Sequence, residues 1–237
     1  MLLYQPTKGY SYNSDSIFLY NFIREFKPKG TLLDVGCGVG VISSLLTRDF
    51  KIDTYIIDKQ KKMLEYAKIN FNINRLNIKN IYEEDFLNLK IDTKFDFIVS
   101  NPPFYKSSNV TQSSIKEINI ARYSHHLPLE EFIRKSKELL KARGNLIFCY
   151  DAKQIDNILY FLIKYKINPE VLRFVHSKID RSSKLVMIKA RLNSKSMLDI
   201  KPPLVVFDKN SQYTKEAKEA FLNASTHTIK GDIEFLC

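Results

Sequence analysis

An Asn-Pro-Pro-Phe tetrapeptide at residues 101–104 is the part of the sequence best suited to chemistry on an amine. It follows the apolar run 95–100, which is typical of a buried strand, and two prolines must end that strand because they fix φ and remove backbone donors. The Asn101 side-chain oxygen and the Pro102 carbonyl can then accept hydrogen bonds from an exocyclic amine, while Phe104 stacks on the ring. Taken alone, the tetrapeptide is more often only a loop with a buried aromatic residue.

A glycine-rich stretch upstream favours the chemical interpretation. The apolar segment 31–35 runs into Gly36, Gly38 and Gly40, and a helical pattern follows. The chain has only 7 glycines, so three of them within five positions is a marked concentration. It predicts a backbone that approaches a ligand closely.

Acidic residues follow two further apolar segments. Asp58 ends the segment 54–57, and its separation from Asp34 leaves room for one crossover helix, which predicts a βαβ unit. A carboxylate at such a strand end commonly holds ribose hydroxyls, although Asp58 could instead cap the next helix. Asp85 and Phe86 follow a third segment at the same predicted edge. Asp85 could accept a hydrogen bond from the amino group of a cofactor adenine there. The alternative is that Asp85 belongs to a solvated acidic turn.

The segment 104–127 is the longest stretch without periodicity, and it is rich in cationic and aromatic side chains. Long irregular loops in compact domains are usually functional. Arg122 and Tyr123 suit phosphate contact and stacking next to a base pocket, with Lys106 and Tyr105 beside them. We therefore expect these residues to bind a nucleic-acid substrate.

The charge of the chain points to the same kind of partner without proving it. With 37 Lys and Arg against 26 Asp and Glu, the formal net charge is +11 and the pI is about 9.4. A polyanionic partner explains this surplus, and so does a Lys-rich proteome. A hydrophobic content of 44% predicts a packed globule rather than a disordered chain.

The cysteines and histidines do not indicate a metal site. The three cysteines are far apart, so neither a zinc site nor a disulfide framework is expected, and a reducing, cytoplasmic location fits. The adjacent pair His125 and His126 has no third ligand at a usable spacing. Neither a signal peptide nor an apolar run of membrane-spanning length is visible, so we expect no membrane partner.

The elements that must position these groups alternate along the chain, which predicts an α/β fold. We expect one domain over 1–237, with an N-terminal lid and helix at 1–29 and a C-terminal strand–helix extension at 201–237. In the N-terminal part, 2–12 suits a hairpin or an extended lid, and the helix is expected to begin at an N-cap on Ser14 and to stop at Pro28 and Gly30. Strands are expected at 31–35, 54–57, 78–82, 95–100, 145–150, 171–175, 185–190 and 204–207, and helices at 60–72, 128–142 and 155–165.

In combination, these motifs resemble the class I, Rossmann-like S-adenosylmethionine-dependent methyltransferases. In that class D-x-G-x-G-x-G holds the methionine part of the cofactor and N-P-P-[FY] holds an amine substrate. The resemblance implies a doubly wound, mostly parallel sheet of about seven strands with helices on both faces. It also implies S-adenosylmethionine as cofactor and cofactor-binding roles for Asp34, Gly36, Gly38, Gly40, Asp58, Asp85, Phe86 and Asp15.

More narrowly, the chain is similar to the bacterial tRNA(Val) adenine-37 N6-methyltransferases. The similar features span nearly the whole sequence: Gln5 with Tyr10, Asp15-Ser16, 34–40, 101–105, 121–123, 204–206 and 213–214. This similarity implies methylation of an adenine beside the anticodon, with tRNA as partner, Asn101, Pro102 and Phe104 as catalytic residues and Tyr105, Lys106, Arg122 and Tyr123 as substrate-binding residues.

Phe104 stands where that group often has Tyr, so alternatives with the same motif stay open. Asn-Pro-Pro-Phe also resembles ribosomal RNA guanine N2-methyltransferases, and release-factor glutamine methyltransferases share Asn-Pro-Pro-Tyr. Both groups usually carry an extra N-terminal domain, whereas about thirty residues precede the first strand here.

Two unrelated classes explain less of the sequence. A nicotinamide dehydrogenase would want G-x-G-x-x-G and would leave the Asn-Pro-Pro-Phe motif unexplained. A non-catalytic RNA-binding module would explain the charge but not the acids Asp34, Asp58 and Asp85 at successive strand ends. The oligomeric state cannot be predicted from the sequence.

Overall fold

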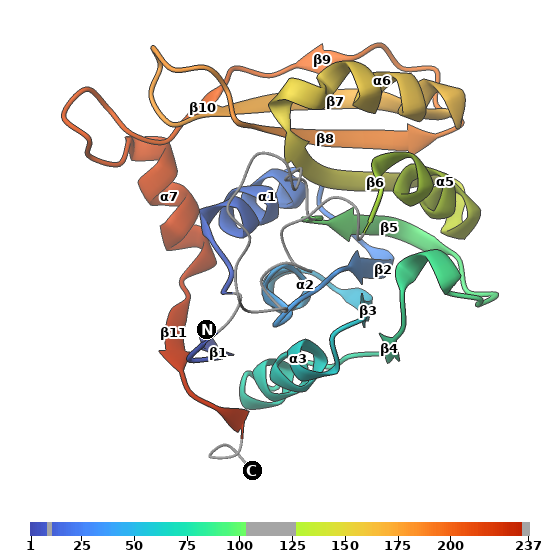
Figure 1. The fold of residues 1–237 in the computed structure, drawn as a ribbon, viewed down its shortest axis with the longest axis vertical. Helices are drawn as coiled ribbons and strands as arrows, with labels where there is room; N and C mark the ends of the chain where they lie inside the picture. Colours follow the sequence, from blue (N-terminus) through green and yellow to red (C-terminus); the bar gives the residue numbers. More distant parts are fainter. Residues whose placement is uncertain (9–10, 103–126, 234–237) are drawn as a thin grey trace.

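The computed structural model describes residues 1–8, 11–102 and 127–233. In this part of the chain the main sheet has nine strands in the order β10-β7-β8-β6-β5-β2-β3-β4, with β9 also paired to β7 (Figure 1). The predicted class, a doubly wound and mostly parallel sheet, is confirmed. The count exceeds the expected number of about seven, and the two shortest strands, β9 (Asp199–Ile200) and β10 (Leu204–Val205), lie beside β7. β10 falls within the strand predicted at 204–207, whereas no strand is predicted at β9.

Five neighbouring strands of the described chain run parallel: β2 (Gly30–Val35), β3 (Ile52–Asp58), β4 (Asn80–Glu83), β5 (Phe95–Ser100) and β6 (Leu140–Asp151). Their carboxyl ends therefore meet along one edge of the sheet. The chain moves outward from β2 through β3 to β4 and then returns to place β5 on the other side of β2. The strand order reverses between β2 and β5, and such a point opens a crevice for ligands.

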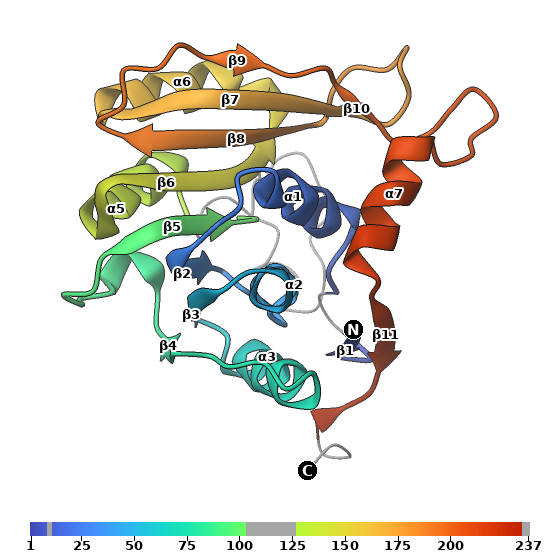
Figure 2. The ribbon, with the colours of Figure 1, turned by 180° about the vertical axis from the view of Figure 1, so that it is seen from behind.

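Helices cover both faces of this sheet. On one face α1 (Ser14–Arg24) packs against α2 (Val41–Asp49), and on the other α5 (Leu129–Leu139) packs against α6 (Ile155–Lys164) (Figures 1 and 2). Helix α3 (Lys61–Ile73) contacts α2 and β3. Because both faces are covered, the central strand β5 is apolar and buried at nearly every position.

An antiparallel hairpin completes the far side of the sheet. It consists of β7 (Ile167–His176) and β8 (Leu185–Leu192), and β8 pairs with β6. The buried carboxylate of Glu170 in β7 accepts hydrogen bonds from Lys189 and from Arg191. Burial raises the pKa of Glu170, but the hydrogen bonds from these cations and from Ser194 outweigh it and lower the pKa to about 2. This network ties the two strands together.

The two ends of the chain meet in a second sheet. Strand β1 (Leu2–Gln5) pairs in parallel with β11 (His227–Lys230), which follows α7 (Lys215–Ala224) (Figure 2). The sequence predicts a hairpin or an extended lid at 2–12, and its last ten residues carry no signal. The predicted hairpin differs from the observed pairing, because β1 pairs with a strand at the opposite end of the chain. A parallel pair of this kind needs no local turn.

Most predicted boundaries agree with the structure within a few residues. Helix α1 is capped by Asn13, whose side chain accepts from the backbone N–H of Asp15 at 3.1 Å, rather than by Ser14. The helix predicted at 128–142 ends at Leu139 because the following residues already belong to β6, which meets β5 across an irregular register. Among the described residues, no helix is long and apolar enough to cross a membrane.

Candidate active site

The glycine loop lies where the strand order reverses, between β2 and α2. The backbone N–H groups of Gly36 and Cys37 donate to the carbonyl of Ile57 at 2.9 and 3.1 Å, which ties the loop to β3. Gly36 and Gly38 have φ values of 65° and 54°, and a Cβ at either position would meet nothing within 4 Å. Glycine is therefore needed for the backbone conformation, and this side of the loop stays open to a ligand.

A small cleft opens beside the loop. Its lining combines the N-terminal segment, the end of β2, the glycine loop and the residue after β5, and it includes Tyr12, Ser16, Asp34, Gly36, Gly38 and Asn101. The predicted cofactor loop and the predicted catalytic Asn thus share one cavity. The parallel pairing of β2 with β5, with Val35 opposite Ser100, brings them together.

Asp34 is the buried acid of this cleft. It is 1% exposed, and its Oδ2 accepts from the backbone N–H of Ser43 at 3.2 Å. Burial is the main cause that raises the pKa of Asp34 to about 7; the hydrogen bonds from Ser43 oppose the rise and the nearby Asp58 adds to it. A carboxyl that titrates near neutrality in a ligand cleft would be stabilised in its charged form by a cationic partner.

Asp58 lies at the end of β3, and its two oxygens hold backbone donors. Oδ2 accepts from the N–H of Gly38 and Oδ1 from the N–H of Gln60, both at 2.9 Å. Asp58 therefore holds the glycine loop and also the residue before α3, although the N-cap of this helix is Gln60 and no side chain caps it. Each oxygen has a second lone pair, so ribose binding stays a prediction.

Asp85 and Phe86 stand farther along the same edge, after β4. Asp85 accepts from the N–H of Leu87 at 2.9 Å and so begins the 3₁₀ turn η1 (Phe86–Asn88). The buried ring of Phe86 packs on Phe132 with the ring centroids 5.9 Å apart. Neither residue lines the cleft beside the glycine loop, and their cofactor-binding roles stay predictions.

Asn101 follows β5, and its side-chain amide is held from two sides. Its Nδ2 donates to Oγ of Ser16 at 3.1 Å, and its Oδ1 accepts from Sγ of Cys149 at 2.9 Å. Pro102 is buried directly after it. The other predicted residues of this motif and its loop lie outside the described residues: Phe104, Tyr105, Lys106, Arg122 and Tyr123.

Asp15 lies close to the site without lining the cleft. Its carboxylate accepts from Nδ2 of Asn13 at 2.9 Å, and burial raises its pKa against the effect of that hydrogen bond. Its cofactor-binding role stays a prediction. Tyr12 and Cys149 were not singled out from the sequence, because neither belongs to a motif. Only the path of the N-terminal segment and the register of β6 bring them to the site.

The doubly wound sheet with a glycine loop after its first parallel strand is the fold of the class I methyltransferases, whose methyl donor is S-adenosylmethionine, and Asn-Pro-Pro after β5 is the motif of those members that act on an amine. The chain belongs to the methyltransferase small domain family, whose model matches residues 13–159. The matched range contains the glycine loop, Asp58, Asn101 and Cys149, and it ends before the β7–β8 hairpin and the C-terminal strand.

Curated relatives share most of their length with this chain. Two examples, from different bacteria, are both named tRNA1(Val) (adenine(37)-N6)-methyltransferase. The protein of Flavobacterium psychrophilum is 27% identical over 78% of this chain and 80% of its own length. That of Actinobacillus pleuropneumoniae serotype 5b is 22% identical over 87% of this chain and 86% of its own length.

Solved structures agree on the fold. The crystal structure of a predicted O-methyltransferase from Agrobacterium tumefaciens matches 92% of this chain and 100% of its own, with a TM-score of 0.69 at 13% identity. The ribosomal protein L11 methylase of Lactobacillus delbrueckii matches 81% of this chain and 84% of its own, with a TM-score of 0.58 at 18% identity. At these identities the likeness concerns the fold alone.

Proposed function

We propose that the protein transfers a methyl group from S-adenosylmethionine to N6 of an adenine in tRNA, at position 37 beside the anticodon. The main support is that Asn101, an acceptor suited to an exocyclic amine, lines the same cleft as the glycine loop. The names of the curated relatives supply the substrate class. The net charge of +11 supports an RNA partner, and a tRNA substrate implies the cytoplasmic location that we propose.

The residues of the cleft fit S-adenosylmethionine. Gly36 and Gly38 leave space beside the backbone, and the carboxyl of Asp34 offers a counter-charge to the ammonium group of the methionine part. Asp58 keeps acceptor capacity for ribose hydroxyls. When bound, the cofactor supplies an electrophilic methyl group on a sulfonium.

Asn101 and Pro102 would act on the amine. The N6 nitrogen of adenine is a poor nucleophile because its lone pair is delocalised into the ring. Two acceptors, Oδ1 of Asn101 and the Pro102 carbonyl, would accept hydrogen bonds from its two N–H groups. These hydrogen bonds would favour the pyramidal geometry that attack on the methyl group requires. The same acceptors would stabilise the positive charge that develops on nitrogen as the N–CH₃ bond forms and the S–CH₃ bond breaks. The methylated nitrogen would then lose one proton to water, so no carboxylate base is needed.

The rest of the motif and its loop would hold the substrate. We propose that Phe104, with Tyr105, stacks on the flipped base, an interaction of about 1–3 kcal/mol. Lys106, Arg122 and Tyr123 would contact the RNA around it. We further propose that residues 1–237 act as one methyltransferase unit, in which 1–29 supply β1 and helix α1 beside the cleft and 201–237 form an extension.

The test is methyl transfer from labelled S-adenosylmethionine to unmodified tRNA or to ribosomal subunits, followed by digestion to nucleosides. We expect label in N6-methyladenosine from tRNA. The Asn101→Ala variant should lower transfer by about 100-fold or more and leave cofactor binding nearly intact, because its oxygen acts on the substrate in the transition state. An exposed residue on α3, changed as Asn72→Ala, is the matched control.

Other outcomes would change the assignment. Label in methylguanosine from ribosomal RNA would favour the guanine N2 alternative, and label in a purified release factor would favour glutamine methylation. Unchanged turnover in Asn101→Ala would refute the proposed role of this residue.

A further inference from the structure

The amide of Asn101 is held by two buried partners that come from distant parts of the chain. Ser16 is 5% exposed and belongs to the first turn of α1, while Cys149 is 0% exposed and belongs to β6. We propose that Cys149, by donating its thiol proton to Oδ1, and Ser16, by accepting from Nδ2, hold the Asn101 amide in its reactive orientation. Cys149 is thus a positioning residue, an inference that rests on the proposed function.

The strand register explains why Cys149 reaches Asn101. β5 and β6 are parallel neighbours with Ser100 opposite Phe148, so the next residues, Asn101 and Cys149, stand side by side. Ser16 reaches the amide because α1 packs against β6. Both partners are buried and both contacts are partly buried, which limits the competition of solvent for the Asn101 amide.

The orientation of the amide decides whether it can hold an amine. The oxygen and the NH₂ group of Asn have nearly the same size, and a flipped side chain would present a donor to the donor groups of the substrate. In the flipped state Nδ2 would face the sulfur of Cys149, which is a weak acceptor. The observed pair of contacts therefore favours the orientation in which Oδ1 lies on the Cys149 side and Nδ2 on the Ser16 side, with one lone pair of Oδ1 left for the amine.

Cys149 is suited to this role because it keeps its proton. Burial raises the pKa of the Cys149 thiol well above its ordinary value, and the negative charge of Asp15 raises it further. The sulfur is therefore an S–H donor at neutral pH. A thiol is a weak donor, so the Asn101 oxygen remains a good acceptor for a second hydrogen bond.

The test compares three variants of the full chain. Cys149→Ala removes the donor, Cys149→Ser keeps one, and Ile147→Val removes one heavy atom from a buried residue two positions earlier on β6. We expect Cys149→Ala to slow single-turnover methyl transfer about 3- to 10-fold while the cofactor Kd changes less than about twofold. Cys149→Ser should restore most of the rate, and Ile147→Val should match the wild type.

A double-variant cycle tests whether Cys149 acts through Asn101. In the Asn101→Ala background, followed over long incubations, Cys149→Ala should cause no further slowing. If Cys149→Ala lowers the folded fraction, Ser16→Ala removes the other partner and should slow transfer by a similar factor.

Three results would overturn the positioning role: an unchanged rate in Cys149→Ala, an equal loss in Ile147→Val, or a Cys149→Ser variant as slow as Cys149→Ala. Each of these, combined with an inactive Asn101→Ala, leaves the proposed function standing. A wild-type enzyme that leaves no label in N6-methyladenosine of tRNA would instead overturn the function itself, so the two failures are distinguishable.

Discussion

At the scale of single residues, Asp34 links the cleft to the stability of the fold. Its folded-state pKa of about 7 lies above the value of about 3.9 expected in the unfolded chain. Between these values the unfolded chain loses this proton and the folded chain keeps it. Stability is therefore lost as pH rises through this window, by an amount on the order of 4 kcal/mol.

The Asp34→Asn variant should remove this pH dependence. Its free energy of unfolding should exceed that of the wild type increasingly from pH 5 to pH 8, because Asn cannot ionise, while cofactor binding weakens. Urea denaturation at several pH values measures the first effect and calorimetry the second. The exposed Asp53 of β3, changed as Asp53→Asn, controls for the loss of one carboxyl. A stability difference that stays constant over this range would contradict the prediction.

At the scale of elements, the strand at the end of the chain helps to shape the cleft near its beginning. The hydroxyl of Tyr12, which lines the cleft, lies 2.8 Å from Oγ1 of Thr228 in β11. The backbone N–H of Tyr12 donates to Oε1 of Gln5 in β1 at 2.9 Å, and β1 pairs with β11. The second sheet therefore holds one wall of the cleft.

We expect Thr228→Val to weaken S-adenosylmethionine binding about 2- to 5-fold, the size of one neutral, partly exposed hydrogen bond. Tyr12→Phe should cause a similar loss, and the double variant should be no weaker than either single variant. Calorimetry measures all three, with His227→Ala on the same strand as the control. Additive losses would show that Thr228 does not act through Tyr12.

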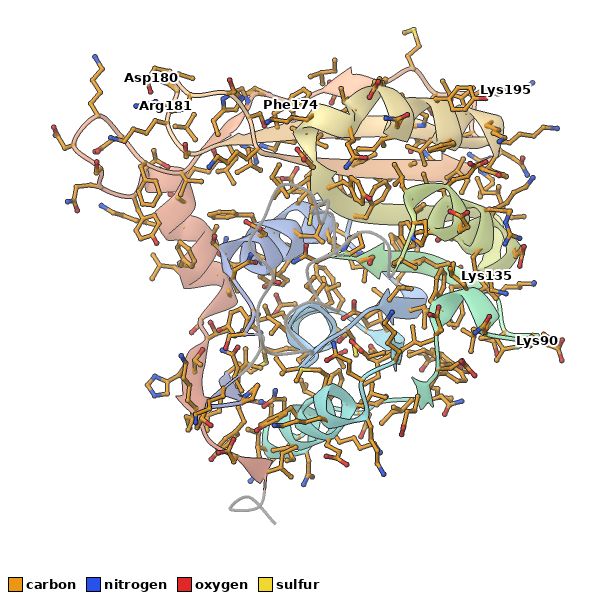
Figure 3. The ribbon with its side chains drawn as sticks, viewed as in Figure 1. Lys90, Lys135, Phe174, Asp180, Arg181 and Lys195 are labelled. Carbon is orange, nitrogen blue, oxygen red and sulfur yellow. The ribbon has the colours of Figure 1, made fainter. Side chains whose placement is uncertain are left out.

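At the scale of the whole molecule, the two ends of the β7–β8 hairpin place cations at opposite edges of the sheet. The turn at 177–184 carries Arg181 and follows the carboxyl end of β7, which runs parallel to β6, so it lies at the edge where Asn101 stands. Lys195 follows β8 at the other edge. Figure 3 shows Arg181 and Lys195 at opposite ends of the hairpin.

If tRNA lies along the edge that carries Asn101, the two cations should behave differently. Arg181→Ala should weaken tRNA binding and reduce the slope of log affinity against log salt by about one phosphate contact. Lys195→Ala also removes one positive charge, but it should leave the tRNA affinity and the salt slope nearly unchanged. Binding titrations at several salt concentrations measure these slopes, and equal effects of the two variants would place the RNA elsewhere.

Local patterns were sufficient to predict the fold class and the core of the site. The glycine loop, Asp58 and the Asn-Pro-Pro motif each follow an apolar strand, and parallel strands bring their carboxyl ends to one edge whatever the details of packing. Helix α1 was also predicted from its apolar period and its stop at Pro28 and Gly30. In each case the signal lies within a few residues of the element it describes.

Long-range pairing decided the rest. Nothing near Cys149 marks it as a partner of Asn101, because only the register of β5 and β6 sets the two side by side. The pairing of β1 with β11, which brings Thr228 to Tyr12, joins the two ends of the chain and has no local signal. Such contacts depend on which distant strand completes each hydrogen-bond ladder, and that choice is made only when the whole sheet assembles.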